Sequence, residues 1–401
     1  MSRDFDVILY GVTGFTGRQT VQYFQKHCPP TVKWAIAARN GEKLARLAEE
    51  LGLPDSVERI AAEASDTIAI KEMVRRSRVL LTTAGPYARF GTNLIAACCR
   101  NGTHYVDITG ETWWVRDMLD RYDGDARISM AKIIPFCGFD SIPSDITTFL
   151  AHQRMRDSGD ETLSARGYFE VSGGFNGGTL HSGLNMYDAG AEEQAANPSL
   201  LLPSRSGGVR PAPDPDGAYF DSDVLSWVAP FFMGMINSRV VHRSAALAFN
   251  YGESYGSEFS YQEFQKLGGL NPLPALGVAT ALGTFRNLGK VEVFRKLASM
   301  LGPAPGEGPS EKAMNAGYSA IEVVARGKKG TRVRAKLAVD GDPGNRATVL
   351  FACEAALCIA TSEAELPGGP TRVGFLTPAT GLGLRYVERL KAAGVRISVD
   401  A

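Results

Sequence analysis

Three glycines near the N-terminus have the spacing of a backbone turn that holds phosphate. Gly11, Gly14 and Gly17 follow the apolar run Phe5–Tyr10, and a second apolar run begins at Val32. Gly11 permits a sharp turn, Gly14 lets a pyrophosphate approach backbone N–H groups, and Gly17 packs the following helix tightly against the strand. This order predicts a dinucleotide site, with an ordinary glycine-rich turn as the alternative. The expected contacts within the turn are Gly11, Thr13, Gly14, Phe15, Thr16 and Gly17.

An arginine after the second apolar run indicates which dinucleotide is bound. Residues 37–40 read Ala-Ala-Arg-Asn, Lys43 lies one turn further on, and no carboxylate lies between the second apolar run and Glu42. An acidic residue at this place would bind the ribose hydroxyl of NAD, whereas an arginine pairs with the 2′-phosphate of NADP. We therefore expect Arg39 and Lys43 to bind NADP. Two ordinary surface cations at the start of a helix are the alternative.

Strand and helix patterns continue to alternate as far as residue 136, which predicts a doubly wound parallel sheet. Ligands bind beyond the carboxyl ends of such strands, where three loops contain polar or glycine-rich sequence: Gly85–Tyr87, Asp107–Glu111 and Cys137–Asp145. Gly85 and Pro86 are expected to contact the cofactor. The candidates for a proton donor are Tyr87, Asp140 and Ser141. Alternatively, Tyr87 forms a wall of the cofactor site, and Asp140 with Ser141 caps a helix.

The second half of the chain predicts a mixed sheet. A strand is expected at 165–171, followed by a glycine-rich turn at 172–179, an irregular excursion at 197–223 and a hairpin formed by 320–326 and 331–339. The uncharged runs 224–238 and 267–285 are a poor match to a membrane span, because the first is short and the second contains prolines and glycines. The first run contains four large apolar side chains: Trp227, Phe231, Phe232 and Met235. They are expected to contact a hydrophobic substrate, a partner subunit or a membrane, or to pack in the core of the second domain.

Composition excludes several function classes. The chain has 401 residues with 43 basic and 43 acidic side chains, and this balance gives no indication of a nucleic-acid partner. The five histidines form no metal-binding spacing. Residues 252–256 fit the G-x-S-x-G elbow of hydrolases, but no histidine follows Ser254, so the ordered triad cannot be completed. With no visible signal peptide and six cysteines lacking a C-x-x-C pair, we expect a cytoplasmic protein, in contact with a membrane if the apolar runs face one.

Several motifs together resemble a known family. V-T-G-F-T-G-R at 12–18, A-G-P-Y-A-R-F-G at 84–91 and C-G-F-D-S-I-P-S-D at 137–145 are similar to the saccharopine dehydrogenase-like oxidoreductases, and most similar to their trans-acting enoyl reductase branch. The motifs at residues 177–180, 341–344 and 376–380 are also similar to this family. The resemblance implies an α/β fold, in which an N-terminal Rossmann-type doubly wound parallel sheet carries an inserted mixed α/β (α+β) substrate domain. The expected parts are an NADP-binding domain at 1–137, a substrate or dimerisation domain at 138–375 and a helix at 376–401 that returns to the first domain.

The resemblance also implies a function. It predicts an NADPH-dependent enoyl reductase that transfers a hydride to an acyl or polyketide-type thioester, carried by a synthase or carrier protein in polyketide or lipid biosynthesis. The aromatic and methionine-rich lining favours a hydrophobic acyl group over the charged substrate of a saccharopine dehydrogenase. An enzyme acting on an amino acid or imine is the second hypothesis, and a non-catalytic NADP-binding module is the third. A homodimer is a further expectation.

Overall fold

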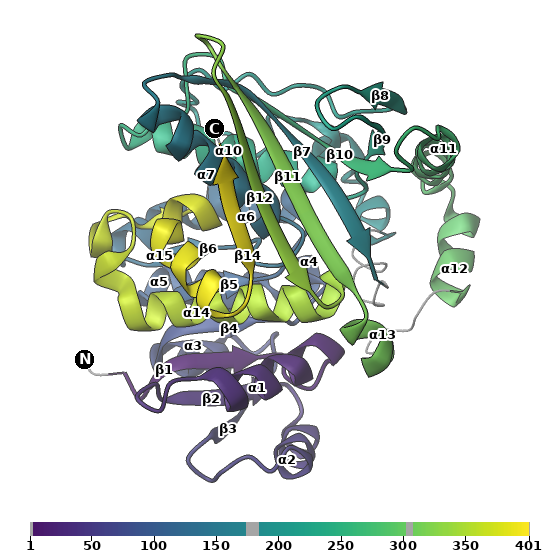
Figure 1. Ribbon diagram of the computed structural model, residues 1–401. Coiled ribbons are helices and arrows are strands. Elements are labelled where there is room, and N and C mark those ends of the chain that lie inside the picture. The colour runs from purple at the N-terminus through teal and green to yellow at the C-terminus, as the bar shows by residue number, and fades with distance from the viewer. Residues whose placement is uncertain (1–2, 174–183, 302–307, 401) are drawn as a thin grey trace.

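Short apolar strands alternate with amphipathic helices in the first third of the chain, and this alternation builds one parallel sheet. In the computed structural model, which describes residues 3–173, 184–301 and 308–400, the strand order is β13-β6-β5-β4-β1-β2-β3 (Figure 1). All six pairings are parallel. The elements are β1 Phe5–Tyr10, α1 Phe15–His27, β2 Trp34–Ala38, α2 Gly41–Glu50, β3 Glu58–Ala61, α3 Thr67–Arg75, β4 Ser77–Thr82, α4 Tyr87–Phe90, α5 Thr92–Asn101, β5 His104–Asp107, α6 Thr112–Ile128 and β6 Lys132–Ile134.

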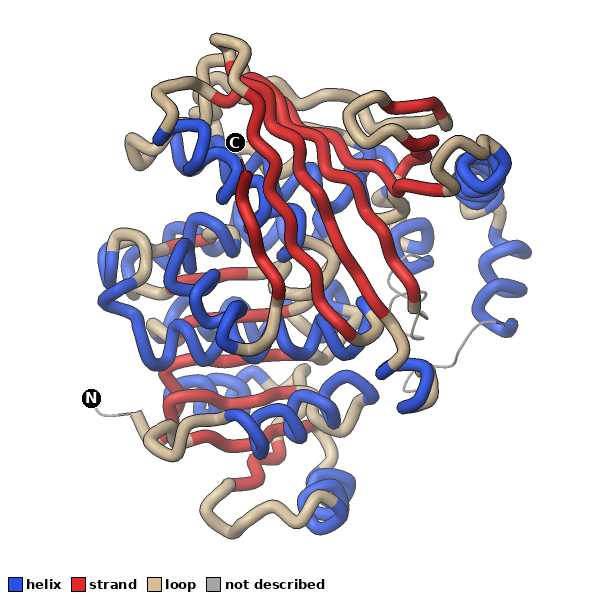
Figure 2. Tube along the Cα trace, in the orientation of Figure 1, coloured by secondary structure: helices blue, strands red, loops and turns tan. Residues whose placement is uncertain are grey.

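A second seven-stranded sheet follows, in the order β14-β12-β11-β7-β10-β9-β8 (Figure 2). Its β7 and β10 are parallel, and its other neighbours are antiparallel, including the predicted hairpin of β11 and β12. The expected α/β fold with a Rossmann-type sheet and a mixed second sheet is thus confirmed. The elements are α7 Ile142–Asp157, β7 Thr162–Ser172, α9 Glu192–Ala196, β8 Tyr219–Asp221, β9 Ser226–Pro230, α10 Gly234–Asn250, β10 Ser260–Leu267, α11 Leu273–Leu288, α12 Glu292–Leu301, α13 Glu311–Asn315, β11 Tyr318–Gly327, β12 Arg332–Asp340, α14 Thr348–Ser362, β13 Gly374–Phe375, α15 Pro378–Ala392 and β14 Arg396–Asp400.

The C-terminal elements are distributed between the two sheets in a way that the expected domain boundaries at 137 and 375 do not describe. α14 packs against β1, β4 and β5 of the first sheet, and β13 extends that sheet beside β6, although both elements lie inside the range 138–375. Within 376–401, β14 instead pairs with β12 of the second sheet. A two-residue strand has no readable sequence pattern, and β14 pairs with a strand that is distant in sequence, so neither assignment follows from local pattern.

One helix of the described part of the chain is long and apolar enough to cross a membrane, and it belongs to the core. The helical stretch 343–365 meets the length and composition test, but 78% of its most apolar window is buried. A helix that is apolar on all sides is expected in the interior of a soluble fold. The runs singled out by sequence form other elements: 224–238 is divided between β9 and the start of α10, and 267–285 contains most of α11.

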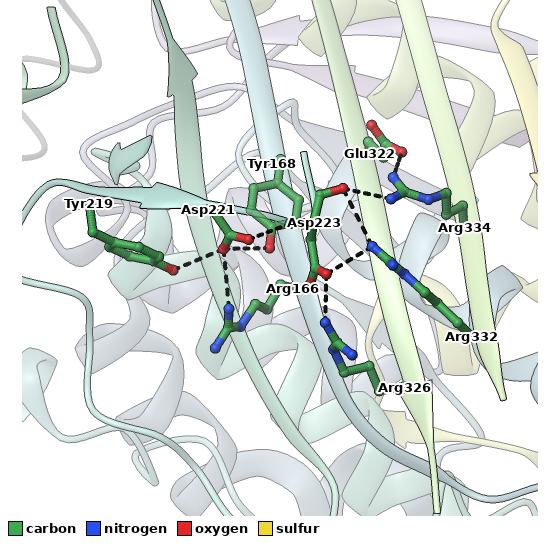
Figure 3. A network of polar contacts seen from close by, with 9 residues as sticks. All are labelled: Arg166, Tyr168, Tyr219, Asp221, Asp223, Glu322, Arg326, Arg332 and Arg334. Carbon is green, nitrogen blue, oxygen red and sulfur yellow. Dashed lines mark hydrogen bonds and ion pairs between the residues drawn. The ribbon is translucent and has the colours of Figure 1, made fainter. Parts of the chain in front are cut away.

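A network of charged and phenolic groups fixes the connection between β8 and β9 on the second sheet (Figure 3). The Asp221 carboxylate accepts hydrogen bonds from the hydroxyls of Tyr168 and Tyr219 at 2.9 and 3.2 Å. Asp223 pairs with Arg326 at 2.5 Å and with Arg332 at 2.8 Å. Both aspartates are almost fully buried, so these paired charges have a structural role and hold the segment against β7, β11 and β12.

Candidate active site

A large cavity lies between the two sheets, beyond the carboxyl ends of the parallel strands. Its volume is about 1820 Å³. One end is lined by the loops that follow β1, β2, β4 and β5, and the other by the segment 230–236 and by residues of α11 and α12. The cavity therefore has a cofactor-sized polar end next to the glycine turn and an apolar end in the second domain.

The glycine turn is closely packed and leaves room for a ligand above it. Gly11 has a φ of +86°, and a Cβ added there would lie 2.9 Å from Ala84 in the loop after β4. A Cβ on Gly14 would meet only the Gly11 oxygen, at 3.4 Å. α1 begins after Gly14 without a side-chain cap, so its first N–H groups have no side-chain acceptor. Such a helix N-terminus suits a pyrophosphate, so the turn fits the dinucleotide predicted from its sequence.

Two cations face the cavity at the end of β2. Arg39 and Lys43 both line it, and neither side chain forms an ion pair with a residue that the structure describes. Asn40 caps α2 by accepting a hydrogen bond from the Lys43 backbone N–H at 2.9 Å. The carboxylate of Glu63, after β3, also lines this end. Free cations at the ribose end of a dinucleotide site are the groups expected to receive a 2′-phosphate.

The loop after β4 supplies one wall of the cavity and is held by a buried carboxylate. Gly85 and Pro86 line the cavity and are joined by a cis peptide bond. The Glu111 carboxylate accepts hydrogen bonds from the backbone N–H groups of Tyr87 and Ala88 at 2.8 and 2.9 Å. These bonds satisfy the exposed donors at the start of α4. The role of Glu111 could not be predicted from the sequence, because Glu111 and Tyr87 belong to different loops that only the fold brings together.

Tyr87 lies on the cavity wall with its hydroxyl already bound. Its OH donates to the Thr82 carbonyl at 3.1 Å, and its ring lies 5.8 Å from that of Trp114. Burial raises the pKa of Tyr87 well above its usual value, and the nearby Asp107 acts in the same direction. A buried phenol whose proton is bound to a backbone carbonyl is poorly placed to release that proton, so this arrangement favours a role in forming the wall.

Asp107 holds the ends of two neighbouring strands together. Its carboxyl accepts hydrogen bonds from the Tyr105 hydroxyl at 2.8 Å and from the backbone N–H groups of Thr109 and Phe136 at 3.0 Å. Burial raises its pKa to about 7, although these bonds oppose the rise. All its contacts fix the loops after β5 and β6, and it does not line the cavity.

Asp140 differs from the fully buried carboxyls because it is only partly buried, faces the cavity and has no partner in the part of the chain that the structure describes. It follows β6 and lies next to Gly110, where an added Cβ would be 3.6 Å from Asp140 Oδ2. None of the residues that the structure describes donates a hydrogen bond to its carboxyl or pairs with it. Burial alone raises the pKa of Asp140 to about 7. A carboxyl that exchanges its proton near neutral pH and faces a cavity is suited to acid–base chemistry.

Ser141, the neighbouring candidate, points away from the cavity into a buried network. Its hydroxyl donates to Asn237 Oδ1 at 3.2 Å, and Asn237 Nδ2 donates to Glu263 at 2.6 Å. Glu263 also accepts from Ser144 at 2.8 Å and Tyr261 at 2.9 Å. These bonds join α7, α10 and β10, so the structure places Ser141 in the packing between these elements.

Apolar side chains line the end of the cavity in the second domain. Phe231, Phe232 and Met235 line it, together with Met233 and Ile236, whereas Trp227 lies outside the lining and packs edge-on against Phe220 at 6.5 Å. Sequence reasoning missed the opposite wall, because α11 and α12 contribute to it at positions with no recognisable motif. The missed lining residues include Leu184, Asn185, Met186, Tyr187, Leu282, Phe285, Arg286, Arg295, Lys296, Gly344 and Thr348.

The remaining motifs lie elsewhere or outside the described residues. Ser254 donates a hydrogen bond to the Gly256 carbonyl at 3.3 Å in a turn that does not line the cavity. The glycine-rich stretch 177–180 falls outside the residues that the structure describes. Asp342 and Thr377 each cap a following helix through their side chains. Within the described part of the chain, no group of three or more histidine, cysteine or acidic side chains could hold a metal ion.

Comparison with known proteins gives matches over the whole chain. Residues 7–129 match the saccharopine dehydrogenase NADP binding domain, so NADP is the cofactor of the first domain. A trans-acting enoyl reductase from Mycobacterium bovis is 33% identical over 98% of this chain and 97% of its own length. Its counterpart from Mycobacterium ulcerans is 31% identical over 99% and 98%. Saccharopine dehydrogenase (L-Glu forming) from Saccharomyces cerevisiae shares the fold, with a TM-score of 0.53 and 13% identity, over 99% of this chain and 100% of that one.

Proposed function

Because the chain belongs to the trans-acting enoyl reductases, within the saccharopine dehydrogenase-like oxidoreductases, we propose that it reduces the double bond of an enoyl thioester with NADPH. The single observation that carries the proposal is the position of Asp140. Its carboxyl, which has no partner among the described residues, lines the same cavity as the glycine turn and lies at Gly110 with Met233 and Ile236 of the apolar end. An enoyl thioester needs a hydride donor, an apolar site for its chain and one proton at the α-carbon.

The cofactor residues follow from the lining of the polar end. The first N–H groups of α1, after Gly11, Gly14 and Gly17, would hold the pyrophosphate, and Thr13, Phe15 and Thr16 would surround it. Arg39 and Lys43 would pair with the 2′-phosphate, and Gly85 and Pro86 would contact the cofactor from the loop after β4. When bound, NADPH supplies a hydride to the β-carbon of the substrate.

Asp140 completes the reduction as the acid. As a hydride reaches the β-carbon, the electron pair of the carbon–carbon double bond moves toward the α-carbon and the thioester carbonyl. The protonated Asp140 carboxyl gives its proton to the α-carbon, and the resulting carboxylate regains a proton from water. Since the pKa of Asp140 is raised to about 7, a large fraction of the enzyme holds this proton at neutral pH.

The acyl chain belongs at the other end of the cavity. Phe231, Phe232 and Met235 present carbon and sulfur surface to a substrate. Of the cations that also line this end, Arg295 and Lys296 are paired with Asp188 and Glu292. This lining supports an acyl group over an amino acid. The relatives are named as trans-acting, and we propose that a separate synthase or carrier protein likewise delivers the thioester here.

The test is NADPH oxidation by the full chain with a crotonyl or longer enoyl thioester. We expect kcat of the wild type to fall as pH rises through about 7, because deprotonation removes the donor. Asp140→Asn should lower kcat by about 100-fold or more without changing NADPH affinity, and Asp140→Glu should retain part of the rate. An Asp140→Asn enzyme with wild-type kcat and pH profile would refute the donor role.

The same assay separates the alternative functions. Turnover of an imine or amino acid, with none of any enoyl thioester, would favour a saccharopine dehydrogenase-like activity. NADPH binding without turnover of any acyl, imine or carbonyl acceptor would favour a non-catalytic module.

A further inference from the structure

The helix pair α11 and α12 carries an unusual concentration of exposed aliphatic side chains. In Figure 1 these helices stand at the right edge of the molecule, beside the end of the second sheet. Of the sixteen large hydrophobic residues exposed in the described part of the chain, seven lie between 270 and 293, so this short segment holds far more than its share. Leu273 and Leu276 of α11 are 70% and 47% exposed, and Ala275 is the only buried residue of that helix.

As far as Phe285, α11 lacks the charges that a surface helix normally carries on its solvent side. No charged residue occurs from Leu267 to Phe285. A helix on the surface of a soluble protein normally has polar and charged groups on its outer face. A concentration of exposed apolar side chains in one segment is typical of a surface that contacts a protein or a membrane.

Cations lie next to this apolar surface without local neutralisation. Arg286 and Lys290 are exposed, and neither side chain is in an ion pair with the described residues. The nearest other charges are already paired, Lys296 with Glu292 at 2.7 Å and Arg295 with Asp188 at 2.8 Å. The free charge at this end of the surface is therefore positive, which complements an anionic partner.

We propose that this part of the molecule docks on an anionic membrane surface through an α11 face, made up of Leu270, Leu273, Leu276, Leu288, Val291 and Val293. Aliphatic side chains enter the boundary between lipid headgroups and acyl chains, while Arg286 and Lys290 remain at the level of the anionic headgroups. A protein partner is the weaker match, because the centre of a protein interface typically contains aromatic and arginine anchors. The six residues of the α11 face are leucine and valine, whereas the neighbouring Phe285 and Arg286 line the cavity.

Docking in this way would bring the lipid next to the apolar end of the cavity. Leu282 and Phe285 line the cavity from α11, which also carries Leu273, Leu276 and Leu288 of the α11 face. A hydrophobic acyl chain could then pass between lipid and cavity with little exposure to water. This consequence rests on the proposed function, whereas docking itself does not.

The experiment is flotation of the full chain with vesicles of phosphatidylcholine containing phosphatidylglycerol, compared with phosphatidylcholine alone. We expect the wild type to float with the anionic vesicles, and Leu276→Glu with Leu288→Glu to reduce the bound fraction about 10-fold or more. Lys290→Gln should weaken binding to anionic vesicles and leave the neutral ones unchanged. A matched control is Ile68→Glu with Ile128→Glu, which places the same charge at residues 75% and 86% exposed on α3 and α6 and should behave as wild type.

Three results would overturn the proposal: no flotation of the wild type with either vesicle, equal flotation of the leucine double variant, or conversion of a dimer to a monomer by that variant without any vesicle binding. The last result would assign the α11 face to a second copy of the chain. Circular dichroism and NADPH binding show that the variants are folded. Turnover of water-soluble crotonyl thioester by the leucine variant should equal that of wild type, so a failure of docking is distinguishable from a failure of the reductase function.

Discussion

A Cβ atom on Gly17 would lie 2.3 Å from the carbonyl oxygen of Gly11. No real Cβ makes such a contact with a backbone atom, and the turn between β1 and α1 is therefore possible only with glycine at position 17. The first turn of α1 can lie close to the end of β1 for this reason, and the proposed pyrophosphate site depends on it.

Gly17→Ala should therefore destabilise the first domain, by about 2 kcal/mol or more, because backbone atoms must move apart. Gly14→Ala is the matched control, since its Cβ would meet only one atom, at 3.4 Å. It should change the free energy of unfolding by less than about 1 kcal/mol while weakening NADPH binding, because the new methyl group faces the ligand. Urea unfolding and NADPH titration check both variants; equal stability of the two alanine variants would contradict the packing argument.

Arg39→Asp should weaken NADPH binding by about 100-fold and NADH binding far less, because the arginine is proposed to pair with the 2′-phosphate that only NADPH has. Fluorescence titration with both cofactors measures the difference. Arg46→Asp makes the same charge change further along α2, at an exposed residue outside the cavity, and should leave both affinities nearly unchanged. Equal losses for NADPH and NADH in Arg39→Asp would contradict the assignment.

The features that could be predicted from the sequence are those with a local pattern. The glycine turn, the parallel strands and the β11–β12 hairpin each depend on residues close together in the chain. The isolation of Asp140 could not be predicted in this way, because it depends on Gly110 and on side chains from α10 that determine what reaches its carboxyl. Ser141 has the same local sequence context as Asp140, yet its hydroxyl binds Asn237, almost a hundred residues away.

The wall of the cavity formed by the second domain also could not be predicted from local sequence. Leu282 and Arg286 carry no motif, and they line the cavity because α11, which packs on β9 and β10 of the second sheet, reaches the same cavity as the glycine turn. Conversely, the G-x-S-x-G pattern around Ser254 is local and complete, but it occurs in a turn away from the cavity. A sequence motif predicts a catalytic site only where the fold brings the other catalytic residues next to it.

Asp140→Asn should raise the melting temperature at pH 8, with a smaller gain at pH 5. The pKa of Asp140 is raised by burial from 3.8 to about 7, so the folded state binds this proton more tightly than the unfolded state. The stability that the proton contributes is fully present below about pH 4 and is lost as pH rises through about 7. The amide never ionises, so it avoids the cost of a buried charge at pH 8.

Thermal melting at several pH values measures this difference. Asp107, Asp145 and Glu263 also have a pKa raised to about 7 by burial, so the variant removes only part of the pH dependence of wild type. Asp55→Asn removes an exposed carboxylate and should leave the melting curve unchanged in shape. A gain in melting temperature that is the same at pH 5 and pH 8 would show that folding does not raise the pKa of Asp140.

Met235→Gln should discriminate between long and short acyl chains. Met235 lines the apolar end of the cavity, and an amide there would lose hydration when a hydrocarbon chain enters. We expect kcat/KM for a long-chain enoyl thioester to fall about 10-fold, corresponding to roughly 1.4 kcal/mol, and kcat/KM for a crotonyl thioester to change little, because its chain is too short to reach this wall. Met130→Gln, at an exposed residue after α6, is the control. An equal fall for both substrates would place the acyl chain elsewhere in the cavity.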